Sequence, residues 1–167
     1  MSALSEKNNN IIEFKSITVY TAALLQEAGL EAAKKLNIKN GFLAVIDSRG
    51  AILSARAIGQ PLSLNVDVAI AKGKTVNAIH RSTSVQRERM AQANSTTNDY
   101  SGTLGSLFPG GVAIFLDENH SDYVGAIVFG GGTGEEDEII CLAPVLKAGF
   151  FTDVVPTEQQ KIKLASL

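Results

Sequence analysis

The residues best suited to chemistry gather in one stretch, Gly125 to Glu138. In it, an apolar run is followed by glycines and then by four acidic residues. Glycines at positions 130, 131, 132 and 134 let the backbone adopt positive φ and let another group approach its N–H atoms. Thr133 is a predicted helix N-cap, and acids at 135–138 suit the positive end of a helix dipole. The stretch therefore predicts a strand, a glycine turn and the start of a helix.

This turn does not suit phosphate, although a glycine turn before a helix is an anion site in principle. The acids already neutralise the helix end, and Glu135 and Glu136 stand where a phosphate-binding loop has Lys followed by Ser or Thr. Two interpretations stay open. The turn is purely structural, or it serves a neutral or cationic ligand group or a neighbouring subunit. Its candidate ligand-binding residues are Phe129, Gly131, Gly132 and Thr133.

His80 is a candidate haem ligand near the end of a predicted helix, and haem iron is the only metal we assign to it. Imidazole suits iron, and the neighbouring Arg81, or Arg56 of a predicted strand, could pair with the haem propionates. The alternative is a histidine that the helix dipole stabilises at a C-terminus. His120 lies in a predicted turn, and we expect it to be exposed to solvent.

A second set of side chains fits an enzyme that acts on a small organic acid or an aromatic catabolite. The candidates are His80 and Tyr100 as acid or base, Glu135 and Asp137 as carboxylates, and Arg56 and Arg81 as substrate clamps. A carboxylate at a helix start has a lowered pKa, which makes it a poor base unless it is desolvated.

Lys72 is a further catalytic candidate, on a predicted helix. A lysine at a helix interface usually snorkels or forms an ion pair, whereas a buried lysine with a lowered pKa could act as a base. The sequence shows no catalytic triad, metal-ligand cluster or nucleotide fingerprint, so the residues alone assign no reaction.

Composition indicates one globular domain, since the chain has 167 residues and is 45% hydrophobic. A net charge of −2 without a long basic run favours neither nucleic acid nor an acidic membrane as a partner. Cys141 is the single cysteine and is predicted to be a small core residue. The polar N-terminus and the lack of a long apolar run predict a cytoplasmic protein.

Hydrophobic periodicity predicts four helices and four strands. The helices are expected at 18–36, 65–80, 84–93 and 135–148, and the strands at 41–47, 51–58, 112–116 and 123–129. Strands joined by hairpins imply an antiparallel sheet covered by helices, which is an α+β fold. The irregular segment 94–111 is long enough to be functional.

Two residues mark special points in the predicted helices. Pro144 should kink the last helix or end it early. Gly73 costs about 1 kcal/mol relative to alanine, which indicates close packing there, for example against a helix of another subunit. We divide the chain into an arm at 1–15, one domain at 16–150 and a tail or oligomerisation arm at 151–167.

Four motifs give the chain a resemblance to the GlcG/HbpS family, the heme-degrading-domain-like proteins also seen as the C-terminal part of PduO. They are the hairpin Ala44 to Gly50, the helix Val68 to Thr75, the segment Pro109 to Ile114 and the glycine turn with its acidic sequel up to Glu138. The resemblance covers about residues 16–150. It implies a profilin-like fold, homo-oligomers in which glycine turns meet across subunits, and haem or another small molecule as ligand.

The chain departs from the family pattern at Gly73, His80, Phe129 and Gly130, and throughout 94–108. These changes could reshape a pocket, and they weaken the transfer of a haem role. Our leading interpretation is an oligomeric small-ligand-binding protein, with haem or a related cofactor as one candidate ligand. The alternatives are an enzyme of small-molecule catabolism and a structural subunit.

Overall fold

A four-stranded antiparallel sheet forms the centre of the computed structural model, which describes residues 14–100 and 102–167. Its strands are β1 (Gly41–Asp47), β2 (Ile52–Ile58), β3 (Gly111–Phe115) and β4 (Tyr123–Gly130), in the order β2-β1-β4-β3. The helices are α1 (Val19–Lys35), α2 (Ser63–Ile79), α3 (Thr83–Gln92), the 3₁₀ helix η1 (Thr97–Tyr100), α4 (Gly134–Lys147) and α5 (Glu158–Ala165). The predicted profilin-like α+β fold, an antiparallel sheet flanked by helices, is confirmed.

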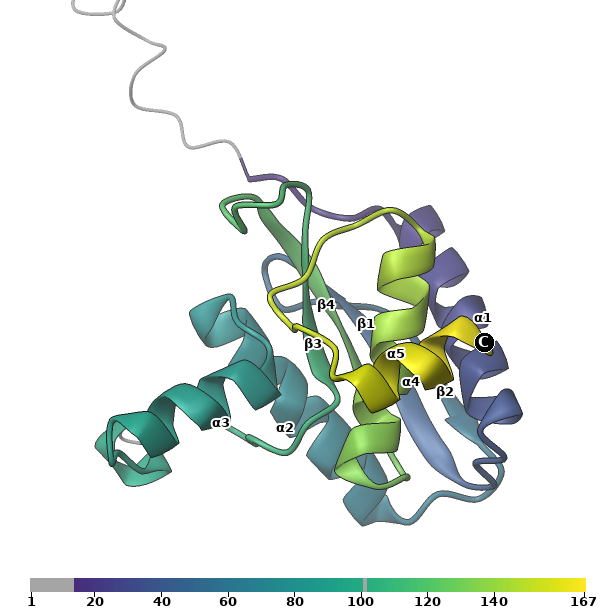
Figure 1. The fold of residues 1–167 in the computed structure, drawn as a ribbon, viewed down its shortest axis with the longest axis horizontal. Coiled ribbons are helices and arrows are strands. Elements are labelled where there is room, and N and C mark those ends of the chain that lie inside the picture. The colour runs from purple at the N-terminus through teal and green to yellow at the C-terminus, as the bar shows by residue number, and fades with distance from the viewer. Residues whose placement is uncertain (1–13, 101) are drawn as a thin grey trace, which may run out of the picture.

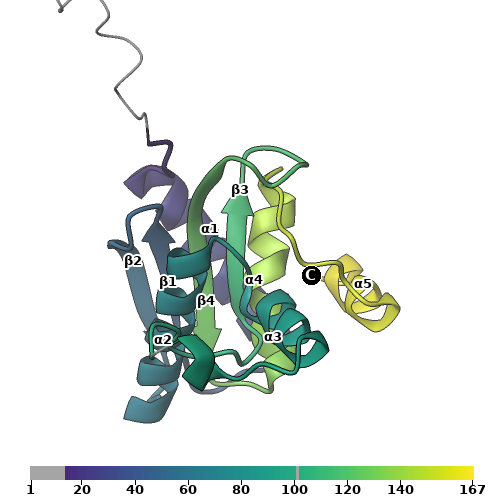
Figure 2. The ribbon, with the colours of Figure 1, turned by 90° about the vertical axis from the view of Figure 1, so that its left-hand side faces the viewer.

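Helices cover both faces of the sheet, with α1 and α4 on one face and α2 on the other (Figures 1 and 2). Side chains alternate between the two faces along each strand, as the pleat requires. On β1, Leu43 and Val45 join the cluster that contains residues of α1 and α4, whereas Ala44 and Ile46 join a cluster with Ala69 of α2.

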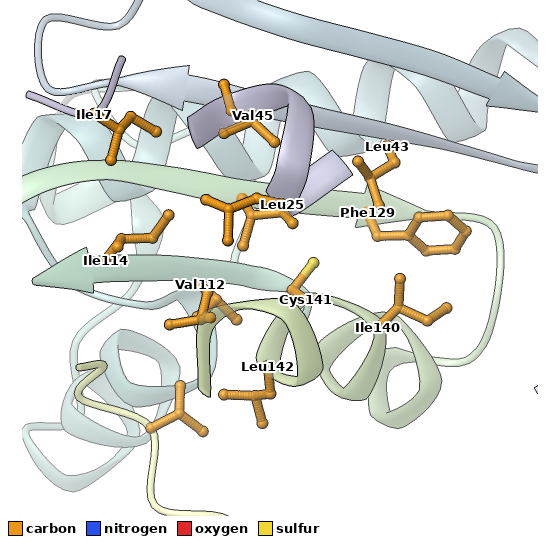
Figure 3. Packing of buried hydrophobic residues seen from close by; sticks show 14 of the residues in the cluster. Ile17, Leu25, Leu43, Val45, Val112, Ile114, Phe129, Ile140, Cys141 and Leu142 are labelled. Carbon is orange, nitrogen blue, oxygen red and sulfur yellow. The ribbon is translucent and has the colours of Figure 1, made fainter. Parts of the chain in front are cut away.

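The larger core lies between the sheet and the pair α1 and α4 (Figure 3). Leu25 of α1, Ile140 of α4 and Phe129 of β4 belong to this cluster, and all three are buried. Cys141 is fully buried in the same cluster. It is therefore a core residue, as its apolar helical position predicts.

The close packing expected at Gly73 is with the sheet of the same chain. A Cβ atom at Gly73 would lie 2.2 Å from Cδ1 of Ile46 on β1. Alanines at positions 44 and 69 lie in the same interface. Small side chains thus let α2 approach the sheet, and the contact is not with a helix of another subunit as we expected.

Helix α4 continues past Pro144 and ends at Lys147, so of the two predicted effects, a kink or an early end, the early end does not occur. Proline removes one backbone hydrogen bond from a helix. Leu142, Pro144 and Val145 are all buried, and their packing compensates for that loss.

The segment after residue 150 folds back onto the domain. Phe151 forms two backbone hydrogen bonds with Phe115 of β3, at 2.9 and 3.0 Å. Helix α5 packs on α4, and its Lys163 donates to Glu135 over 2.8 Å. An additional role of this segment in oligomers stays a prediction. The predicted N-terminal arm, 1–15, lies almost wholly outside the described residues.

Within 14–100 and 102–167, no helix is both long and apolar enough to cross a membrane. The irregular segment between α3 and β3 is attached to α2, because Gly105 N and Ser106 N donate to Thr75 Oγ1 over 2.9 and 3.1 Å. This attachment lets the following residues reach the glycine turn at the end of β4.

Candidate functional site

A buried lysine ammonium group is the centre of the site. Lys72 lies on the face of α2 that packs on the sheet, and it is 1% exposed. Its Nζ donates to the carbonyl oxygen of Phe129 over 2.7 Å and to Asp137 Oδ2 over 2.6 Å. A buried ion pair is tolerated when further hydrogen bonds satisfy its atoms, and here a backbone carbonyl supplies one.

The glycine turn supplies the second backbone partner. Gly132 N donates to Asp137 Oδ1 over 2.8 Å, so both oxygens of this carboxyl group are engaged. Burial raises the pKa of the Asp137 carboxyl, and the nearby Lys72 opposes that rise. Asp137 is thus a desolvated carboxyl group at a helix start, the condition under which such a group can exchange protons.

Gly110 closes over the ion pair from the side of β3. Its φ is +103°, and a Cβ atom there would lie 2.5 Å from Cβ of Asp137 and 3.0 Å from Nζ of Lys72. Only glycine fits this position. Its carbonyl accepts from Phe129 N over 2.9 Å, which fixes the strand end that in turn holds Lys72.

A pocket of about 260 Å³ adjoins the pair, and we name it the glycine-turn pocket. Its lining residues are Leu64, Asn65, Val68, Lys72, Phe108, Gly130, Gly131, Gly132, Gly134 and Asp137. An ammonium group has three N–H donors, and two of those on Lys72 have acceptors. Among the described residues, the structure gives Lys72 Nζ these two hydrogen-bond partners and no third.

The start of α4 is fixed by reciprocal capping. Thr133 Oγ1 accepts from Glu136 N over 3.3 Å, and Thr133 N donates to Glu136 Oε2 over 2.8 Å. The structure therefore confirms Thr133 as the predicted N-cap. These contacts lower the pKa of Glu136. Glu135 points instead to α5, where it pairs with Lys163.

His80 lies at the opposite end of α2 from the glycine turn, about 12 Å along the helix from Lys72 at 1.5 Å per residue. It is the C-cap, with φ of 49° in the left-handed region. Its ring stacks on Tyr123, with centroids 4.1 Å apart and planes 13° apart. Partial burial of the ring lowers the pKa of His80, and burial raises that of Tyr123.

The two candidate arginines also lie away from the pair. Arg56 on β2 is exposed and lies 3.5 Å from Glu27 of α1. Arg81 donates to Gln86 Oε1 over 2.8 Å. Neither lines the glycine-turn pocket. Tyr100 belongs to η1, and its side chain is outside the described part of the structure.

The structure thus gathers Lys72, the Phe129 carbonyl, Gly131, Gly132 and Asp137 at one pocket. It separates them from the other candidates, His80, Arg56, Arg81 and Glu135. Sequence reasoning did not single out Gly110, Phe108, Leu64 or Val68 as site residues. The run Pro109 to Gly111 held a signal for Gly110, since adjacent glycines before a strand indicate close backbone approach.

Three comparisons with known proteins bear on this arrangement. A family described as "Haem degrading protein HbpS-like" matches residues 17–145. A comparison with curated protein sequences gives no match. A comparison with solved structures does give matches.

The chain is similar to the PduOC:haem complex, with 19% identity and a TM-score of 0.70 over 82% of this chain and 98% of that one. It is similar to a double mutant of Streptomyces reticuli HbpS, with 26% identity and a TM-score of 0.70 over 84% of this chain and 92% of that one. It is also similar to the Klebsiella pneumoniae protein ORFY, of the DUF336 family, with 18% identity and a TM-score of 0.70 over 82% of this chain and 93% of that one.

The likenesses to PduOC and ORFY show a shared fold, since their identities are low. The family match rests on the sequence itself and spans most of the chain. The protein therefore belongs to the haem-degrading-protein HbpS-like family.

Proposed function

We propose that this protein binds a small organic acid, or a similar ligand with an oxygen acceptor, in the glycine-turn pocket. The observation that carries the proposal is that Lys72, a residue that lines the pocket, has a buried ammonium group with three N–H donors and two hydrogen-bond partners among the described residues. A buried donor without an acceptor destabilises the folded protein. A carboxylate or carbonyl oxygen of a ligand would satisfy it with a charge-assisted hydrogen bond.

The rest of the pocket supports a ligand with an apolar body. The apolar residues Leu64, Val68 and Phe108 line the pocket together with Gly131 and Gly132. Ligand pockets commonly combine such walls with a few placed polar groups. A volume of about 260 Å³ suits an aliphatic hydroxy acid or a single aromatic ring.

Haem is the second candidate, because the family description names haem degradation and one similar structure holds haem. The residues that line the glycine-turn pocket do not fit it, because they include no histidine, cysteine, methionine or tyrosine that could ligate iron. His80 remains the candidate axial ligand, at the other end of α2. It is exposed and stacks on Tyr123.

An absorbance titration with hemin tests the haem candidate on its own. A saturable Soret shift at one hemin per chain that disappears in His80→Ala would support haem at His80. A weak shift without a fixed stoichiometry, equal in both proteins, would remove haem.

Catalysis on the bound acid is the alternative, and the raised pKa of Asp137 inside a ligand pocket favours it. Asp137→Asn separates the two functions. If the protein is an enzyme, this variant retains binding but no longer converts the acid. We also propose that the protein is a homo-oligomer, and a cytoplasmic location stays a prediction.

Thermal unfolding in the presence of glycolate and of benzoate tests the binding proposal. Ligand that binds only the folded state raises the melting temperature. Val68→Phe should fill the pocket without touching the ion pair, and it should abolish the rise. Ile162→Phe, on the exposed surface of α5, is the matched control and should keep it. A rise that is the same in Val68→Phe would place binding elsewhere and contradict the proposal.

A further inference from the structure

A second pocket lies between α3, the first turns of α4 and the segment 153–160, with a volume of about 620 Å³. We name it the acidic pocket. Its charged lining residues are Arg87, Glu88, Glu135, Glu138 and Asp153. The lining thus includes four acidic residues and one arginine. The acidic pocket shares only Phe108 and Gly134 with the glycine-turn pocket.

Two of its lining side chains carry buried polar atoms without a partner. Glu138 is 6% exposed, and its Oε2 accepts from Gln160 Nε2 over 2.9 Å. Its other oxygen, Oε1, has no hydrogen-bond partner in the part of the chain that the structure describes. Ser84 of α3 is 7% exposed, and its Oγ is likewise unpartnered.

Two of the other carboxyl groups are already engaged. Asp153 accepts from Ser82 N over 3.1 Å and holds the start of α3. Glu135 accepts from Lys163 Nζ over 2.8 Å at the rim. The buried oxygens without a partner among the lining side chains are therefore Oε1 of Glu138 and Oγ of Ser84. A buried polar atom without a hydrogen-bond partner destabilises the fold. A bound ligand that donates to these oxygens would remove this cost.

We propose that the acidic pocket binds the ammonium group of a small aliphatic primary amine, with Glu138 as its main acceptor. An ammonium group carries only donors, three of them on one compact nitrogen, so it can reach oxygens that expose little surface. Its charge complements the excess of carboxyl groups, and its hydrogen bond to Glu138 is charge-assisted. The apolar side chains of Val85, Phe108 and Val154 line the same pocket and can pack against the hydrocarbon chain of the amine.

Isothermal titration with 1,4-diaminobutane and with n-butylamine measures this binding in the full chain. The wild type should bind one amine per chain. Glu138→Gln keeps the shape and removes the charge, and it should weaken binding at least about tenfold, equal to about 1.4 kcal/mol. Ser84→Ala should weaken binding as well. Glu158→Gln is the matched control, because Glu158 pairs with Lys161 on α5 and does not line the pocket.

Tetramethylammonium has the charge of the amines without any N–H donor, and it should bind at least about tenfold more weakly to the wild type. Without amine, Glu138→Gln should melt at or above the wild-type temperature, since it removes a buried carboxyl group with an unsatisfied oxygen. The proposal is overturned if neither amine binds the wild type saturably. It is also overturned if Glu138→Gln binds as tightly as Glu158→Gln.

Discussion

At the scale of single residues, the Lys72–Asp137 pair determines what the site can do. Each member has a backbone partner besides the other, the Phe129 carbonyl for Lys72 and the Gly132 N–H for Asp137. This arrangement ties α2, the end of β4 and the start of α4 to one another. The pair is therefore both part of the fold and one wall of the proposed ligand site.

Loss of one partner should leave the other charge buried and unpaired. We expect Lys72→Met to lower the free energy of unfolding by about 3–5 kcal/mol, as measured by urea denaturation. The double variant Lys72→Met with Asp137→Asn should lose less, because a neutral amide replaces the unpaired carboxylate. A loss below about 1 kcal/mol in Lys72→Met would show that the ion pair is unimportant for stability.

The raised pKa of Asp137 makes its contribution to stability depend on pH. The folded protein holds this proton over a range of pH in which the unfolded chain has already released it. The contribution is therefore full below the ordinary carboxyl pKa and is lost as pH rises through the folded value. Unfolding measured at several pH values should show this decline in the wild type and not in Asp137→Asn. If the stability of the wild type relative to Asp137→Asn instead increases with pH, the effect of Lys72 on the pKa of Asp137 outweighs the effect of burial.

At the scale of the elements, the close approach of α2 to the sheet places Lys72 beneath β4. Gly73 follows Lys72 directly, and the missing Cβ makes room for Ile46 of β1. The neighbouring Ala69 is fully buried against the same strands. A wider spacing here would move Lys72 away from its carbonyl and carboxyl partners.

A double-mutant cycle tests this spacing. Gly73→Ala should destabilise the protein by about 1–3 kcal/mol, because overpacking outweighs the gain in helix propensity. Ile46→Val removes Cδ1, the atom that the new Cβ would meet at 2.2 Å. In that background, Gly73→Ala should be neutral or stabilising when the two are compared by chemical denaturation. Equal losses of stability in both backgrounds would mean that the contact with Ile46 does not set the distance between α2 and the sheet.

The sequence predicted most elements because their signals are local. Apolar periodicity located the four strands and the first four helices to within about two residues at each end. Helix α5 was missed within the predicted tail, although Thr157 and Gln160 form a capping box at the required spacing. The sequence named Lys72 and Asp137 separately, but they are 65 positions apart. No local pattern shows that they meet, or that His80 and Arg56 lie elsewhere.

At the scale of the whole molecule, large apolar side chains remain exposed beside the glycine-turn pocket. Leu64 and Phe108 line that pocket and are 64% and 65% exposed, and Leu62, the N-cap residue of α2, is 71% exposed. Exposed apolar groups that gather in one place often mark an interface. This surface supports the proposed homo-oligomer, in which a neighbouring subunit would cover the mouth of the pocket.

Sedimentation velocity should therefore show an oligomer that Leu62→Glu dissociates. A charge at a covered apolar position is costly to bury. Ile162→Glu is the matched control, since Ile162 is similarly exposed at 73% but lies on α5, and it should leave the assembly intact. A wild-type monomer at all concentrations would contradict the proposed oligomer, and so would dissociation by Ile162→Glu alone.

The most direct test of the central claim is an amide NMR titration of the protein with glycolate and with benzoate. We predict saturable shifts for at least one acid at the amides of Val68, Gly131 and Gly132, and none of these in Val68→Phe. Lys72→Met, if it folds, should bind the same acid at least about tenfold more weakly, since it lacks the ammonium donor. No saturable shift with either acid, or shifts confined to the surroundings of His80, would contradict a ligand site at the glycine turn.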